Sequence, residues 1–74
     1  MQTKFKRHQS VTILRAPHPD TIEWYGVEQL VAKGMRGKIN ILLPNGTYHV
    51  ELLDEKGKTL AYAPFSEDDL EATS

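Results

Sequence analysis

Two glycines three residues apart mark the segment of this chain that comes closest to a binding motif. Gly34 and Gly37 flank Arg36 in a G-x-x-G pattern, and a loop of that form can clamp a nucleic-acid backbone. Where it does so, the loop joins two helices. Here the residues from Ile39 onward alternate in the manner of a strand. We therefore interpret the segment as a turn at the start of a strand.

Basic side chains offer a second route to nucleic acid. Residues 1–38 carry seven Lys/Arg against three Asp/Glu, a charge of +4, whereas residues 39–74 carry two against seven, a charge of −5. Cations that gather on one face bind phosphates in a salt-dependent way. The residues that would form such a face are Lys4, Lys6, Arg7, Lys33, Arg36 and Lys38. The alternative is that the strands interleave and mix the two signs of charge.

Residue types that commonly carry catalysis or bind metals are sparse. The chain has no cysteine, and His8, His18 and His49 are widely separated, without companions at metal-ligand spacing. Ser10 lies near His8, but no third partner and no nucleophile turn accompany them. We therefore expect no enzyme activity, no catalytic residue, no metal site and no cofactor.

Aromatic side chains are candidates for a protein-recognition surface. They include Trp24, Tyr25, Tyr48, Tyr62 and Phe65. A small domain needs its large side chains for the core, so Trp24 can equally cover that core, and Tyr25 is the better contact candidate. With neighbouring cations, the predicted partner-binding residues are Arg15, Trp24, Tyr25, Lys33, Arg36 and Lys38.

The elements that must position these groups are mainly strands. Asn45-Gly46 supplies two residues that tolerate positive φ, and residues 54–57 indicate a type I turn closed by a left-handed glycine. Pro64 predicts an edge position or a strand end, because proline cannot donate to a ladder. The predicted strands are Ser10 to Leu14, Ile39 to Leu43, Tyr48 to Asp54, Thr59 to Phe65 and Leu70 to Ala72, the last preceded by a helical turn that Ser66 caps.

The stretch from Ala16 to Lys33 has two interpretations. Two prolines at its start exclude regular structure there, and we expect a long ordered loop. A short helix is the alternative, because Asp20 and Glu23 match a capping box. Against the helix, Gly26 costs about 1 kcal/mol relative to alanine. We expect residues 1–8 and 73–74 to be frayed.

This order of elements predicts an all-β fold. We expect one domain over residues 1–74, a small SH3-like barrel of about five antiparallel strands with a long first loop and a short helical turn before the last strand. The predicted inward residues are Val11, Ile13, Ile39, Ile41, Leu43, Val50, Leu52, Leu60, Tyr62 and Leu70. Because no apolar run approaches the roughly 18 residues of a membrane span, and cysteine is absent, we expect a cytoplasmic protein without membrane contact, as a monomer or weak dimer.

Three segments carry a resemblance to known barrels. Ser10 to Arg15, the Gly34-x-x-Gly37-x-Ile39 pattern and the turn from Ser66 to Leu70 together resemble SH3-like barrels. Among these, the chain is similar to accessory subunits of photosynthetic electron transport, such as photosystem I subunit IV and the variable chain of ferredoxin:thioredoxin reductase. The glycine spacing also resembles KOW-type barrels of transcription and ribosomal proteins. The first resemblance implies docking on a larger complex, although the loop with Pro17, Pro19 and Trp24 departs from that pattern.

The sequence therefore predicts a non-catalytic interaction or accessory module. Its partner would be a larger protein of unknown identity, contacted through residues 17–33 together with Arg15 and Arg36. The alternative prediction is a small nucleic-acid-binding barrel that uses the basic N-terminal half.

Overall fold

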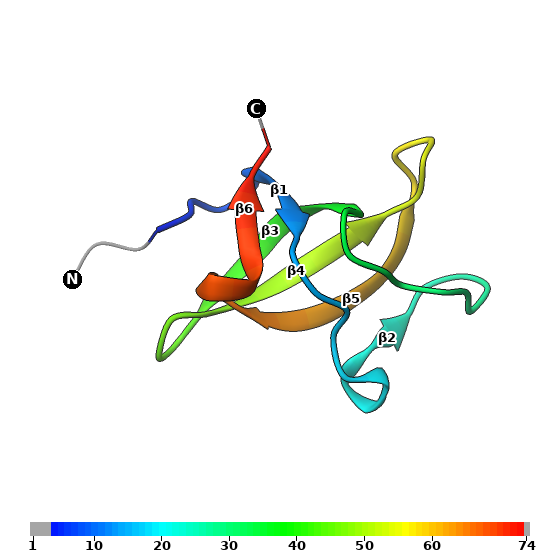
Figure 1. Ribbon diagram of the computed structural model, residues 1–74, viewed down its shortest axis with the longest axis horizontal. Coiled ribbons are helices and arrows are strands. Elements are labelled where there is room, and N and C mark those ends of the chain that lie inside the picture. The colour runs from blue at the N-terminus through cyan, green and yellow to red at the C-terminus, as the bar shows by residue number, and fades with distance from the viewer. Residues whose placement is uncertain (1–3, 74) are drawn as a thin grey trace.

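Six antiparallel strands form a single sheet in the computed structural model, which describes residues 4–73 (Figure 1). The strands are β1 (Ser10–Ile13), β2 (Glu23–Trp24), β3 (Arg36–Leu43), β4 (Thr47–Leu53), β5 (Thr59–Ser66) and β6 (Leu70–Ala72). Their order across the sheet is β2-β5-β4-β3-β1-β6, so β2 and β6 are its edges. The all-β class is confirmed. The sheet is open and has one strand more than the barrel that the sequence predicts.

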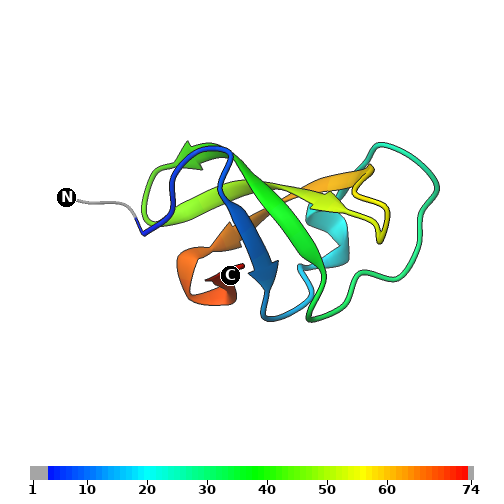
Figure 2. The ribbon, with the colours of Figure 1, turned by 90° about the horizontal axis from the view of Figure 1, so that it is seen from above.

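The sheet bends round a single core. β1 and β6 lie in front of the β3-β4-β5 meander in Figure 1, and Figure 2 shows how strongly the meander twists. The buried apolar side chains come from every strand except β2, and from the segments before β1 and before β3. They are Phe5, Val11, Ile13, Val31, Ile39, Tyr48, Val50, Leu52, Leu60, Ala61, Ala63, Phe65 and Leu70.

Both predicted turns are confirmed. Asn45 and Gly46 have φ values of 63° and 70°, so the tight turn between β3 and β4 uses the positive-φ conformation that the sequence indicates. In the second turn Gly57 has a φ of 81°. The carboxylate Oδ1 of Asp54 accepts hydrogen bonds from the backbone N–H groups of Lys56 and Lys58 at 2.8 and 2.9 Å. Asp54 therefore fixes the turn between β4 and β5.

Replacing Asp54 with alanine is expected to lower the free energy of unfolding by about 1 kcal/mol. Two backbone N–H groups of the turn then lose their carboxylate acceptor and donate to water instead. Glu55→Ala removes a carboxylate from the same turn and is the matched control, with an expected change within about 0.5 kcal/mol. Urea denaturation measures both variants. Equal effects of the two substitutions would mean that the lost charge, and not the turn's hydrogen bonds, determines the change in stability.

A β-bulge in β3 overturns part of the predicted core. Ile39 pairs with Val50, but Ile41 pairs with His49, so Asn40 is an extra residue and the alternation of faces shifts after it. As a result Ile41 is 47% exposed and Leu43 is 36% exposed. Both were predicted to point inward, and both predictions are wrong.

A second irregularity in β5 has a similar effect. Leu52 pairs with Ala61 and Leu53 with Thr59, which leaves Leu60 as the extra residue. Leu60 and Ala61 are therefore both buried, and Tyr62 lies on the outer face, half-buried. The prediction that Tyr62 fills the core is wrong. The remaining predicted inward residues are buried: Val11, Ile13, Ile39, Val50, Leu52, Leu60 and Leu70.

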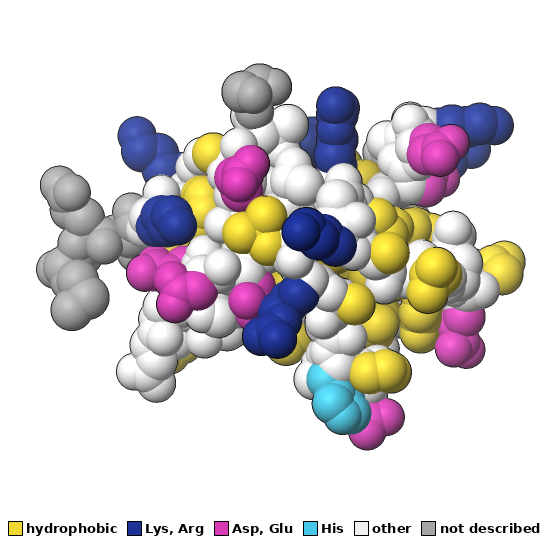
Figure 3. Space-filling view, viewed as in Figure 1, with side chains coloured by type: hydrophobic (Ala, Val, Ile, Leu, Met, Phe, Trp, Pro, Cys, Tyr) yellow, Lys and Arg dark blue, Asp and Glu magenta, His cyan; other side chains and the backbone are white. Residues whose placement is uncertain are grey.

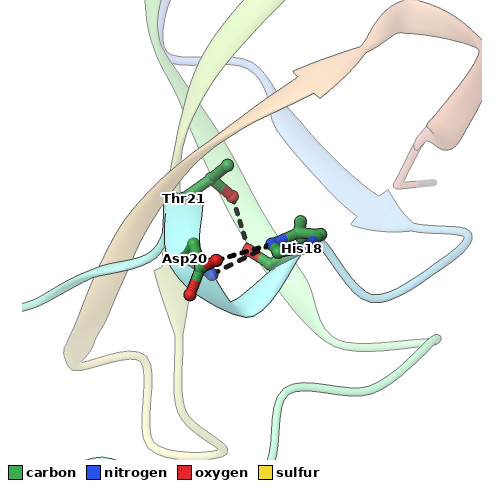
Figure 4. A network of polar contacts seen from close by, with 3 residues as sticks. All are labelled: His18, Asp20 and Thr21. Carbon is green, nitrogen blue, oxygen red and sulfur yellow. Dashed lines mark hydrogen bonds and ion pairs between the residues drawn. The ribbon is translucent and has the colours of Figure 1, made fainter.

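The long first loop contains one helical turn and one short strand. The turn is the 3-10 helix η1 (Pro19–Thr21), and β2 follows it and pairs with Ala61 and Tyr62 of β5. His18 caps η1, since its Nδ1 accepts from the N–H of Asp20 at 3.2 Å and its carbonyl oxygen accepts from the Thr21 hydroxyl at 2.7 Å (Figure 4). The loop prediction holds, and the short helix amounts to a single 3-10 turn.

The other predicted local features are also present. Ser66 caps the 3-10 helix η2 (Glu67–Asp69) before β6. Pro64 pairs with His49 of β4 but lies beyond the two residues of β5 that pair with β2, so β5 has one neighbouring strand at this position. Within residues 4–73 no helix is long and apolar enough to cross a membrane.

The chain ends differ from the expected fraying where the structure describes them. Residues 1–3 and 74 lie outside the described residues. Phe5, however, is only 2% exposed, and the N–H of His8 donates to the carbonyl oxygen of Ile39 at 2.7 Å. At the other end, the N–H of Thr73 donates to the carbonyl oxygen of Ser10 at 3.1 Å. Residues 4–8 and Thr73 are therefore attached to the sheet.

Candidate functional site

Three large apolar side chains project from the segment that connects β2 to β3. Tyr25 is 75% exposed, and Val27 and Leu30 are each 83% exposed. Figure 3 shows hydrophobic side chains gathered on the right of the molecule, where this segment lies in Figure 1. We call Tyr25, Val27 and Leu30 the apolar loop patch. Its members are exposed because the segment passes outside the sheet.

The loop that carries the patch is fixed at both ends. At its start the N–H groups of Tyr25 and Gly26 both donate to the carbonyl oxygen of Leu60, at 3.0 and 3.4 Å. At its end Val31 is 8% exposed and belongs to the core, and the N–H of Gly34 donates to the carbonyl oxygen of Ile13 at 2.9 Å. The sheet therefore presents the patch on an anchored segment.

Trp24 has a structural position next to the patch. It pairs with Ala61 as part of β2 and is a partly buried side chain that packs against the core. The sequence left two roles open for Trp24, partner contact and covering of the core. Its position against the core agrees with the second role. Tyr25 is left as the aromatic side chain that points into solvent.

A hollow of about 1000 Å³ separates the loop from the turn between β4 and β5. Gln29, Leu30 and residues 33–36 line one side, and residues 53–56, Lys58 and Leu60 line the other; we call it the loop–turn groove. Leu60, 5% exposed, and Met35, which packs against the core, contribute apolar surface to its lining. Leu30 of the apolar loop patch also lines the groove, so the two features are continuous.

The charged lining of the groove is mainly positive. Its cations are Lys33, Arg36, Lys56 and Lys58, and its acids are Asp54 and Glu55. Among residues 4–73 the ion pairs join Arg15 to Asp69 and His18 to Asp20, so no cation of the groove has an acidic partner. Asp54 is engaged by its own turn. The groove is therefore a site where anionic groups gain favourable electrostatic energy.

Three of the six cations proposed for a nucleic-acid face lie around this region. Lys33 and Arg36 line the loop–turn groove, and Arg36 and Lys38 line an adjoining hollow of about 380 Å³. The N-terminal cations lie elsewhere: Arg7 Nε donates to the carbonyl oxygen of Asn40 at 3.1 Å, near the other end of β3. Lys4 and Lys6 flank Phe5 in that same N-terminal segment, on the left of Figure 1.

Two cations of the groove escaped the sequence analysis, and one predicted contact residue lies apart from the groove. Lys56 and Lys58 belong to the acidic half of the chain, but the turn between β4 and β5 carries them to the groove. The turn predicted over residues 54–57 could have indicated them, because a turn between two strands projects beyond the sheet. Arg15 is 3.8 Å from the Asp69 carboxylate, beside η2, and does not line the groove.

Of the other aromatic candidates, two are buried and Tyr62 is half-buried. Tyr48 is 1% exposed and Phe65 is 3% exposed, so these two candidates cannot contribute to a recognition surface. Tyr62 stacks on His49, with ring centroids 5.4 Å apart and planes 8° apart. His49 Nδ1 also lies 3.0 Å from Asn40 Nδ2. Within residues 4–73 no group of three or more His, Cys, Asp or Glu could hold a metal ion.

Comparisons of the chain with protein families, curated proteins and solved structures find no match. The functional inference therefore rests on the geometry described above.

Proposed function

We propose that this protein is a non-catalytic interaction module that docks on a larger protein through the apolar loop patch. The observation that carries this proposal is the exposure of Tyr25, Val27 and Leu30 within six consecutive residues. Contiguous exposed apolar side chains mark interaction sites, whereas scattered ones are ordinary. Because the loop is anchored at both ends, binding orders little additional backbone, which lowers the entropic cost of association.

We propose a fold family and a cellular location together with this function. The strand order β6-β1-β3-β4-β5 and the 3-10 turn before β6 support an opened SH3-like barrel, with β2 as an addition from the first loop. The absence of cysteine is compatible with a reducing compartment, and we place the protein in the cytoplasm.

The double substitution Val27→Ser/Leu30→Ser tests the docking proposal. Because both side chains are 83% exposed, we expect the free energy of unfolding to change by less than about 0.5 kcal/mol. Affinity capture from lysate of the native cells should yield a stoichiometric protein with the unchanged chain and lose it with this variant.

Ile41→Ser is the matched control, because Ile41 is an exposed apolar residue of β3 outside the patch. It should retain the captured protein. Two-dimensional amide NMR spectra verify that each variant is folded. Retention of the partner by the folded double variant would show that the patch is not the docking surface.

A further inference from the structure

The residues that line the loop–turn groove indicate the chemistry of the partner. The inference below rests on the proposed function, since it concerns the surface beside the apolar loop patch. We propose that the groove binds an acidic segment of the partner protein that also carries aliphatic side chains. The acidic groups would face the cations of both walls, and an aliphatic side chain would lie on the apolar lining.

The electrostatic part of the proposal follows from the two walls. Lys33 and Arg36 come from the end of the first loop and the start of β3, and Lys56 and Lys58 come from the opposite turn. An anionic segment lying between them is attracted from both sides. The lining also contains two acids, Asp54 and Glu55, but its four cations outnumber them, so attraction of an anionic segment prevails.

The apolar part of the lining distinguishes a peptide from a nucleic acid. Leu30, Leu53 and Leu60 line the groove together with Met35, and its lining contains no aromatic ring. Proteins that bind single-stranded nucleic acid combine cations with aromatic rings on which bases stack. Aliphatic side chains are instead the natural contact surface for leucine, isoleucine or valine. A lining made of cations and aliphatic side chains therefore favours an acidic peptide over a polynucleotide.

Fluorescence anisotropy and amide NMR with the full 74-residue chain test the proposal. The probe is a short labelled peptide of alternating Glu, Asp and Leu. One comparison peptide replaces each Leu with Ser, a second replaces each acid with Lys, and a third probe is oligothymidylate of similar length. We expect the acidic leucine peptide to bind most tightly, to weaken with added salt, and to shift the amides of residues 29–36 and 53–60.

Charge reversal on both walls locates the binding site. Lys33→Glu/Lys56→Glu should weaken binding of the acidic leucine peptide by about tenfold, because like charges then face each other. Lys4→Glu/Lys6→Glu changes the net charge equally, away from the groove, and should alter binding by less than about twofold. All four lysines are exposed, so both variants are expected to fold.

Several results would overturn the proposal. Tighter binding of oligothymidylate through Lys33 and Lys56 would make the groove a nucleic-acid site. Absence of peptide binding, amide shifts away from the groove, or equal weakening by both lysine pairs would exclude an acidic peptide there. The proposed function is judged separately, by the response of the captured protein to Val27→Ser/Leu30→Ser. Loss of that protein without peptide binding would leave the docking surface standing and remove this account of its partner.

Discussion

Replacing Gly37 with alanine is expected to lower the free energy of unfolding by about 3 kcal/mol, an overpacking cost at the upper end of the usual range. Gly37 is buried in β3 and pairs with Val11 of β1 on one side and Leu52 of β4 on the other. A Cβ added to it would lie 2.7 Å from the carbonyl oxygen of Glu51 and 2.7 Å from Cγ1 of Val50. The carbonyl belongs to the β4 backbone, so relief requires the paired strands to move apart.

Gly26→Ala is the matched control for this substitution. A Cβ at Gly26 meets no atom within 4 Å, so the added methyl group should change stability by less than about 1 kcal/mol. Urea denaturation of both variants, with the m-value compared, separates a change in stability from a change in the denatured state. Equal stabilities of the two variants would show that β3 and β4 adjust to a side chain at residue 37 with little cost.

The sequence indicates a turn at the glycine pair but not the reason why residue 37 must be glycine. The Gly34-x-x-Gly37 spacing predicts a turn at the start of a strand, and Gly34 does adopt a positive φ, of 96°. Gly37 is required for a different reason, the close approach of the β4 backbone. That approach depends on how two strands pack, and no local pattern records it.

Local chemistry was the part of the fold that could be predicted best. Asn45-Gly46 and residues 54–57 specify their turns through φ preferences that act within a few residues, and Leu70–Ala72 is the strand that was predicted. The two irregularities at Asn40 and Leu60 could not be predicted, because each is set by the register with a neighbouring strand. A single extra residue reverses the faces of all that follow.

The candidate site combines both kinds of information. The exposure of Tyr25 agrees with the sequence analysis, which placed it on a long loop as a contact residue. The loop–turn groove was not foreseen, because it needs residues 29–36 and 53–60 to lie side by side across the fold. Adding the charges of each half of the chain separated Lys56 from Lys33, although both line one groove.

The N-terminal segment is held to the sheet by a buried tyrosine, Tyr48, which the sequence analysis named only as a candidate for a recognition surface. The hydroxyl oxygen of Tyr48 accepts from the N–H groups of Lys4 and Phe5, at 3.0 and 3.2 Å. The same hydroxyl donates to Oε2 of Glu67 in η2 at 3.3 Å. The rings of Tyr48 and Phe5 meet edge to face, with centroids 5.4 Å apart. One hydroxyl group thus connects the N-terminal segment, β4 and η2.

Tyr48→Phe is therefore expected to lower the free energy of unfolding by about 2 kcal/mol, although it removes a single oxygen atom. The ring and its packing remain, but the buried N–H of Phe5 loses its acceptor, and an unsatisfied buried donor costs about 1–3 kcal/mol. Tyr62→Phe is the matched control. Within residues 4–73 the Tyr62 hydroxyl has no hydrogen-bond partner, so its loss should change stability by less than about 0.5 kcal/mol.

Hydrogen exchange adds a second measurement that locates the effect of Tyr48→Phe. The amide of Phe5 should exchange faster in this variant, and so should that of His8, which donates to Ile39 in the same segment. The exchange rates of amides in the β4–β5 ladder should change only as far as the global stability changes. Uniform acceleration across the sheet, with Phe5 no faster than the rest, would mean that the hydroxyl stabilises the whole fold and not the attachment of the N-terminal segment. Loss of exchange protection at Phe5 and His8 alone would show that the Tyr48 hydroxyl attaches the N-terminal segment to the sheet through the backbone of residues 4 and 5.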